Sequence, residues 1–132
     1  MAALLKSRTV GVSINCDPRT VYEFVSNPEN LPKWATMFCR SIKPSNGEWT
    51  VETPQGPVNI RFSKRNDLGV LDHYVSPSPG VEIFVPMRVV PNGGGAEVLL
   101  TLFRTAEMSD EQYAQDMRWV EQDLNHLKRI ME

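Results

Sequence analysis

The residue best suited to chemistry is His73, which lies in the alternating segment Val70-Leu71-Asp72-His73-Tyr74-Val75. Successive side chains of a strand point to opposite faces, so Leu71, His73 and Val75 share one face, which we expect to point inward. An imidazole with an ordinary pKa near about 6.5 suits acid–base catalysis or hydrogen bonding to a ligand. The alternative is that a neighbouring group satisfies the hydrogen bonding of this histidine, or that the histidine lies at a solvent-exposed rim of the sheet. Asp72 points to the other face and cannot orient the ring.

Three arginines, Arg61, Arg88 and Arg104, also lie in segments with strand-like patterns. An inward-facing arginine could bind a ligand carboxylate through two parallel hydrogen bonds. Arg88 alternates with the apolar Met87 and therefore falls on the opposite face, unless a bulge at Pro86 reverses the register. The alternative is that these arginines face solvent on the convex side.

Other arrangements that carry chemistry are weak or missing. Asp123 and His126 have the i, i+3 spacing seen in metal sites, but the chain has only 2 histidines and no second copy of the motif. Cys16 and Cys39 form no Cys-x-x-Cys pair, and no Gly-x-Ser-x-Gly elbow occurs. The glycines at 93–95 precede a strand pattern, so they indicate a hairpin turn instead of a phosphate loop. We expect no metal, no cofactor, no covalent mechanism and no Cys16–Cys39 disulfide.

Composition places the chain among globular proteins with one domain over residues 1–132. Hydrophobic residues make up 41% and charged residues 23%, and the formal net charge is −2. No basic block is present, which argues against nucleic-acid binding. The first residues are too short for a signal-peptide core, and no apolar run reaches the roughly 20 residues of a membrane span. We therefore expect a cytoplasmic protein without an integral membrane segment.

The elements that would position these residues follow from periodicity and turn signals. Arg8 to Asn15 alternates as a half-buried strand, and two short helical segments, opened by Asp17-Pro18 and Asn27-Pro28, come after it. Ser109, with Gln112 three residues later, predicts the start of a long helix that ends near Met131. Between these helical regions the pattern predicts six strands: Phe38–Lys43, Glu48–Thr53, Val58–Arg65, Val70–Ser76, Val81–Val90 and Ala96–Thr105. Short connections between them indicate antiparallel pairing in an α+β fold.

In this order of elements the chain resembles the START-related SRPBCC superfamily, in the branch of polyketide cyclases, dehydrases and lipid-transport proteins. The resemblance rests on Asp17-Pro18-x-x-Val21-Tyr22-x-Phe24-Val25, on Asn27-Pro28-Glu29-Asn30-Leu31-Pro32-Lys33-Trp34, and on the closing helix with Asp123-Leu124-Asn125-His126-Leu127-Lys128. It implies the helix-grip fold, in which a curved antiparallel sheet of about six or seven strands wraps around the C-terminal helix. It also implies a cavity between sheet and helix, often occupied by a hydrophobic ligand.

The residues and the resemblance together define an expected site and leave three functions open. The ligand-binding residues that we expect are Trp34, Ile60, Phe62, Leu71, His73, Arg88, Met117 and Val120. We expect Trp34 near the mouth of the cavity and the set Val10, Val12 and Ile14 among its walls. The functions are binding or transport of a small hydrophobic or aromatic ligand, catalysis of the aromatase/cyclase or dehydratase type with His73 as the catalytic candidate, and protein interaction. The expected state is a monomer or a homodimer.

Overall fold

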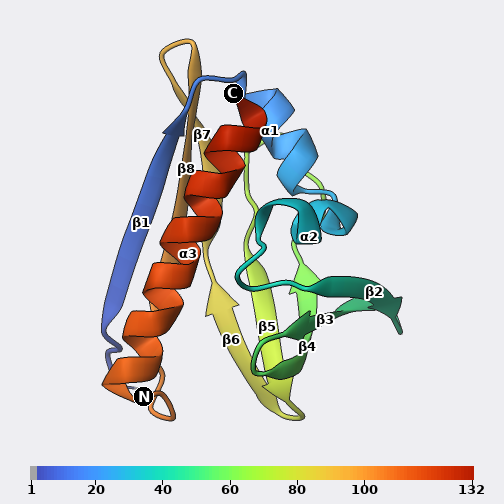
Figure 1. The fold of residues 1–132 in the computed structure, drawn as a ribbon, viewed down its shortest axis with the longest axis vertical. Helices are drawn as coiled ribbons and strands as arrows, with labels where there is room; N and C mark the ends of the chain where they lie inside the picture. Colours follow the sequence, from blue (N-terminus) through green and yellow to red (C-terminus); the bar gives the residue numbers. More distant parts are fainter. Residues whose placement is uncertain (1–2) are drawn as a thin grey trace.

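The computed structural model describes residues 3–132 as an α+β fold of eight strands, one 3₁₀ turn and three α-helices (Figure 1). The N-terminal elements are β1 (Ser7–Ile14), α1 (Pro18–Val25), the 3₁₀ turn η1 (Pro28–Asn30) and α2 (Leu31–Trp34). A meander then comprises β2 (Ser41–Ser45), β3 (Glu48–Thr53), β4 (Gly56–Phe62), β5 (His73–Ser78), β6 (Val81–Val85), β7 (Met87–Asn92) and β8 (Gly95–Phe103), before the long helix α3 (Asp110–Met131). The predicted order, with two short helical pieces after the first strand, is confirmed.

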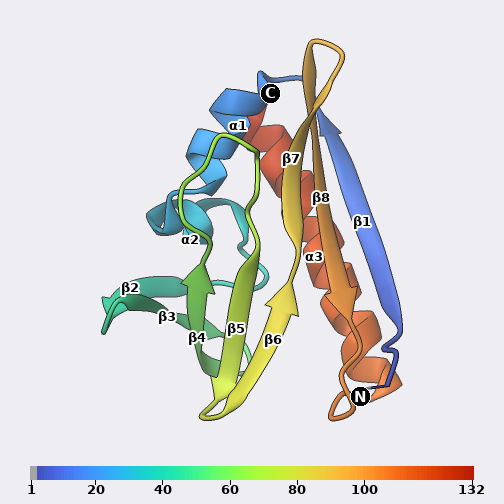
Figure 2. The same ribbon diagram turned by 180° about the vertical axis from the view of Figure 1, so that it is seen from behind.

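The strands form two antiparallel groups that curve around α3. One group has the order β1-β8-β7 and the other has the order β2-β3-β4-β5-β6. Figure 2 shows the two groups side by side from behind, with β6 leading into β7. This is the helix-grip arrangement, with α3 lying across the concave side in Figure 1.

The strand count differs from the expectation at Pro86. The segment expected as one strand over 81–90 is divided into β6 and β7, which pair with β5 and β8 respectively. Proline has no N–H to donate to a ladder, so the chain changes partner there. Two backbone hydrogen bonds join β7 to the segment that precedes β5. They run from Leu71 N to Met87 O at 2.9 Å and from Val89 N to Gly69 O at 2.9 Å. Gly69 has a φ of +73°, and a Cβ on it would lie 2.1 Å from Val89 O, so this join needs a glycine.

The short helical elements begin where the sequence predicts. Asp17 caps α1 by accepting a hydrogen bond from Thr20 N, and Pro18 occupies the first helical position. The Tyr22 hydroxyl accepts from Asn66 N at 2.8 Å, which ties α1 to the connection between β4 and β5. α1 and α2 therefore close one end of the concave side.

Helix α3 begins with half of the predicted capping box. Ser109 Oγ accepts from Gln112 N at 3.0 Å, but the Gln112 side chain donates to Asp116 at 2.9 Å and does not return to the cap. The helix packs mainly on β1 and α2 and has little contact with the five-stranded group. Its buried apolar side chains are Tyr113, Met117, Leu124 and Leu127. Within residues 3–132, no helix combines the length and apolar composition that a membrane crossing requires.

Candidate functional site

A cavity of about 510 Å³ lies between α3, the short helices and the concave face of the strands. Its walls are mainly apolar, and they come from both strand groups and from all three α-helices. The apolar side chains that line its sheet wall are Val58, Ile60, Phe62, Val75, Val81, Ile83, Val85, Met87, Leu100 and Leu102. A mostly apolar, concave site with a few polar groups is typical of small-molecule binding.

Most of the exposed lining residues lie in or beside three connections. These are the β3–β4 turn, which contains Gln55, the β5–β6 turn, beside which Pro77 and Val81 lie at the strand ends, and the segment before α3, which contains Glu107. All three lie at the lower end of the molecule in Figure 1. This end is therefore the mouth of the cavity.

Six of the eight expected site residues line this cavity. They are Trp34, Ile60, Phe62, Leu71, His73 and Val120. Leu71 precedes β5 instead of lying within it, yet it keeps the inward side that alternation predicts. Their role in ligand binding stays a prediction.

Arg88 does not line the cavity. Met87 and Val89 occupy the inner face of β7 and are buried, so Arg88 points outward and forms an ion pair with Asp72. The bulge that would have turned it inward does not occur, because Pro86 ends one strand and a new one begins. Arg61 is also exposed, and it pairs with Glu82 and lies over the Tyr74 ring.

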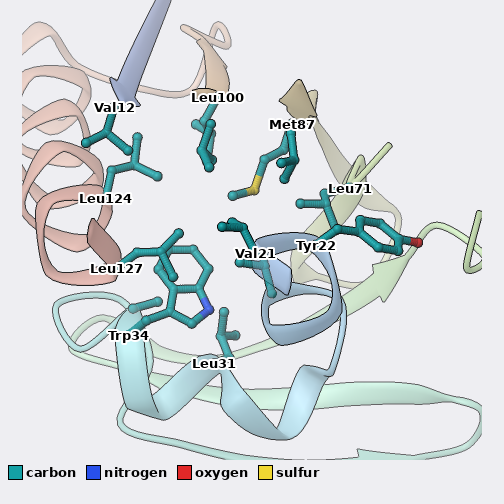
Figure 3. Packing of buried hydrophobic residues seen from close by; sticks show 14 of the residues in the cluster. Val12, Val21, Tyr22, Leu31, Trp34, Leu71, Met87, Leu100, Leu124 and Leu127 are labelled. Carbon is teal, nitrogen blue, oxygen red and sulfur yellow. The ribbon is translucent and has the colours of Figure 1, made fainter. Parts of the chain in front are cut away.

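Met117 and the β1 set also lie outside the cavity. Met117 is buried on α3, and Val12 and Ile14 are buried on β1, the strand against which this helix packs. Figure 3 shows Val12 beside Leu124 of the helix. The sequence pattern identified these residues as inward-facing, but they fill the solid half of the core.

Trp34 lies deep in the molecule instead of at the mouth. Its side chain is 5% exposed, and in Figure 3 the indole lies among Leu31, Val21 and Leu127. Its Nε1 is buried and has no hydrogen-bond partner within residues 3–132. The irregular segment that contains Trp34 is anchored to α3, so the expected position of Trp34 was wrong.

His73 is fixed in one orientation at the cavity wall. Its Nδ1 lies 3.0 Å from the Leu71 carbonyl oxygen, and its ring centroid lies 5.8 Å from that of Phe62. Since a carbonyl only accepts, Nδ1 carries the proton and Nε2 keeps a lone pair. Burial lowers the pKa of His73 below 6.5, although the Leu71 carbonyl and Asp72 oppose this shift. The ring is therefore a neutral hydrogen-bond acceptor at pH 7.

Three polar side chains of α3 face the cavity, and the sequence did not lead us to expect any of them there. They are Gln112, Asp116 and Asp123, which follow one another at spacings of four and seven on one side of the helix. Burial raises the pKa of Asp116, and the hydrogen bond from Gln112 opposes this shift. The signal available in the sequence was this row of polar residues beside the apolar stripe of the helix. A polar row of this kind ordinarily indicates the side of a helix that faces solvent.

Asp123 and His126 hold the chain after α2 against α3. The Asp123 carboxylate accepts from Met37 N at 2.9 Å and Phe38 N at 3.3 Å, and His126 Nδ1 donates to the Trp34 carbonyl at 3.0 Å. Burial raises the pKa of Asp123 to about 6, against the two N–H groups and His126. Both side chains thus serve backbone groups. Within residues 3–132 no group of three or more His, Cys, Asp or Glu side chains could hold a metal ion, and the absence of a metal stays a prediction.

The fold and cavity define a class of small α+β proteins in which an antiparallel sheet wraps a C-terminal helix. The model of the family "Polyketide cyclase / dehydrase and lipid transport" matches residues 7–132, so the chain belongs to this family. The expected superfamily is confirmed. No curated protein matches the sequence.

Solved structures share the fold at low sequence identity. XoxI from Bacillus cereus has a TM-score of 0.78 and 18% identity, over 95% of this chain and 94% of that chain. Ara h 8.0201 has a TM-score of 0.72 and 15% identity, over 97% and 98%. The Aha1 dimer from Colwellia psychrerythraea has a TM-score of 0.76 and 14% identity, over 96% of each chain. These similarities establish the fold and leave the ligand open.

Proposed function

We propose that this protein binds or transports a small hydrophobic or aromatic molecule, lipid-like or polyketide-like, in the cavity between α3 and the sheet. The observation that carries the proposal is the open volume of about 510 Å³ with largely apolar walls. Burial of ligand surface contributes about 25 cal/mol per Å², and a few polar groups orient the ligand. The family description, which includes lipid transport, supports this function. An interaction module would need no open volume here.

The test compares two variants of neighbouring residues on β5. Val75 lines the cavity, whereas Ser76 does not. Val75→Phe should therefore weaken binding of the uncharged fluorophore N-phenylnaphthylamine by roughly tenfold, or about 1.4 kcal/mol. Ser76→Phe should leave it unchanged. Equal effects of the two variants would contradict the proposal. Native mass spectrometry of freshly purified protein should detect the natural ligand, which extraction then identifies.

The second candidate is an aromatase/cyclase- or dehydratase-type enzyme that acts on a polyketide-like substrate. The observation that favours it is the neutral His73, whose free Nε2 could accept a proton from a bound substrate. In an enzyme, His73→Phe should abolish turnover of a polyketide-like substrate and leave binding nearly intact. In a carrier, the same variant should bind apolar probes as well or better and lose preference for polar-headed ones. Product analysis beside fluorophore titration separates the two functions.

The oligomeric state and the cellular location also belong to the proposal. We infer a monomer or homodimer, and the dimeric structure of the similar Aha1 protein supports the second option. The two free cysteines are consistent with a reducing, cytoplasmic location. Sedimentation equilibrium over a range of concentrations would measure the first, and fractionation of cells would test the second.

A further inference from the structure

The ionisable side chains that line the cavity are unevenly distributed in charge. Among the described residues, the acidic lining side chains are Glu107, Asp116 and Asp123, and neither lysine nor arginine lines it. His73, the remaining member able to carry a positive charge, has a lowered pKa and is neutral at pH 7. A carboxylate ligand would therefore find no cation to pair with and no arginine for a bidentate contact.

Asp116 is the carboxylate with capacity left for a ligand. Its described side-chain partner is Gln112, which donates one hydrogen bond at 2.9 Å, and it forms no ion pair within residues 3–132. A carboxylate has sites for about four hydrogen bonds, so most of its capacity is free. Asp123, in contrast, is 4% exposed and is occupied by two backbone N–H groups. Glu107 is exposed at the mouth.

The surroundings of Asp116 favour a cation over an anion. Burial destabilises its charged form, so a positive group beside it would offset part of that cost. Trp119 lies three residues further along α3 and lines the same cavity. An aromatic face attracts a cation through its quadrupole, and it offers an anion no such attraction. Val120, one turn beyond Asp116, continues this side of the helix into the apolar part of the cavity.

We infer that the ligand class is a hydrophobic molecule with a protonated amine, whose ammonium group binds Asp116 near the mouth while its apolar body fills the deeper cavity. This inference rests on the proposed function and narrows it. An ammonium group at hydrogen-bond distance from a partly buried carboxylate gains a charge-assisted bond. A carboxylate at the same place is repelled by Asp116 and Glu107. An uncharged hydroxyl is neither attracted nor repelled in this way, so its affinity is intermediate.

The experiment uses decylamine, decanol and decanoate, three probes with one apolar chain and different head groups. Isothermal titration calorimetry on the full chain at pH 7 should give the order decylamine, decanol, decanoate. Decylamine should bind roughly tenfold more tightly than decanol, a modest part of the attraction between close opposite charges. Decanoate binding as tightly as decylamine would overturn the inference, and this comparison requires no variant.

Two matched variants locate the effect. Asp116→Asn keeps an oxygen for Gln112 but removes the charge, so decylamine should fall to the affinity of decanol while decanol stays unchanged. Asp110→Asn removes the same charge from the first turn of α3, where Asp110 pairs with Arg104 outside the cavity, and should leave all three affinities unchanged. Equal losses for all probes in Asp116→Asn would overturn the inference. If decanol binds and decylamine binds no more tightly, the inference of an amine ligand is refuted while the proposed function stands. If none of the three probes binds, the proposed function is refuted as well.

Discussion

Asp123 is a buried carboxylate whose work is structural. It accepts hydrogen bonds from two backbone N–H groups of the chain after α2, and one of these donors, Phe38 N, is shared with the Ala35 carbonyl oxygen at 3.1 Å. The cost of burying its charge is visible in the pKa, which burial raises from 3.8 to about 6. Protonation near neutral pH therefore competes with the role of Asp123 as a doubly accepting anion.

This pKa predicts a dependence of stability on pH. Between about pH 4 and pH 6 the folded chain holds a proton on Asp123 that the unfolded chain has lost, so the contribution of Asp123 to stability falls as pH rises through this window. Relative to Asp123→Asn, which does not titrate, the wild type should lose on the order of 1–3 kcal/mol across the window. Urea denaturation of both proteins at several pH values measures this difference.

His126 binds the same segment and opposes the raised pKa of Asp123, so its contribution needs a control. The comparison should be repeated in proteins that carry His126→Gln, which removes the imidazole beside Trp34 O. The pH-dependent difference between Asp123 and Asn should persist there. A difference that does not change with pH in either background would show that the folded pKa of Asp123 is not raised.

The side chains of the site differ in how far their sequence reveals them. His73 and Val75 were predicted to face inward because strand alternation allows just two faces, and apolar neighbours mark the inner one. Asp116 and Gln112 could not be predicted in this way. A polar residue that faces an internal cavity and one that faces bulk water give the same helical pattern. The two cases can be told apart only when the position of the cavity beside α3 is known.

Among the elements, α3 has two adjacent faces with different surroundings. Tyr113, Met117 and Leu127 pack into the solid core, whereas Asp116 and Val120 border the cavity. Leu124 is buried and contacts both regions. The predicted apolar stripe thus identified the packing side chains of α3 correctly. Met117, which we expected to line the cavity, packs in the core instead.

Leu124→Ala tests the packing of α3. Leu124 belongs to the buried core cluster, so its truncation should cost about 2–5 kcal/mol in the free energy of unfolding. Ile130→Ala is the matched control on the same helix, because Ile130 is 41% exposed, and it should change stability by less than about 1 kcal/mol. Thermal or chemical unfolding measures both. Equal small losses would place Leu124 against empty space.

The division of the strands was not predictable from alternation. Apolar residues alternate across Pro86 from Val81 to Val89, so the pattern indicates one strand. The missing N–H of Pro86 and the close approach of Gly69 to β7 decide where the chain changes partner. Such long-range pairing depends on residues far apart in the sequence, which periodicity does not compare.

At the scale of the whole molecule, the two thiols report how the domain opens. Cys16 is partly exposed, whereas Cys39 is 2% exposed and burial raises the pKa of its thiol to about 11. In native protein, one thiol should react quickly with a thiol reagent, and the second should react at the rate of unfolding. Cys16→Ser should abolish the fast phase alone. Two fast thiols would indicate local opening beside α2, and no reactive thiol after denaturation would indicate a disulfide.

The sparse contact between α3 and β2–β6 links occupancy of the cavity to cohesion of the fold. A bound molecule would touch both sides and supply van der Waals contacts that the chain does not make with itself. By linkage, a ligand present at 100 times its dissociation constant adds about 2.7 kcal/mol to the free energy of unfolding. The protein without a ligand would then unfold more readily than the protein with one. Proteases that degrade unfolded chains would therefore lower the amount of protein when the ligand is scarce.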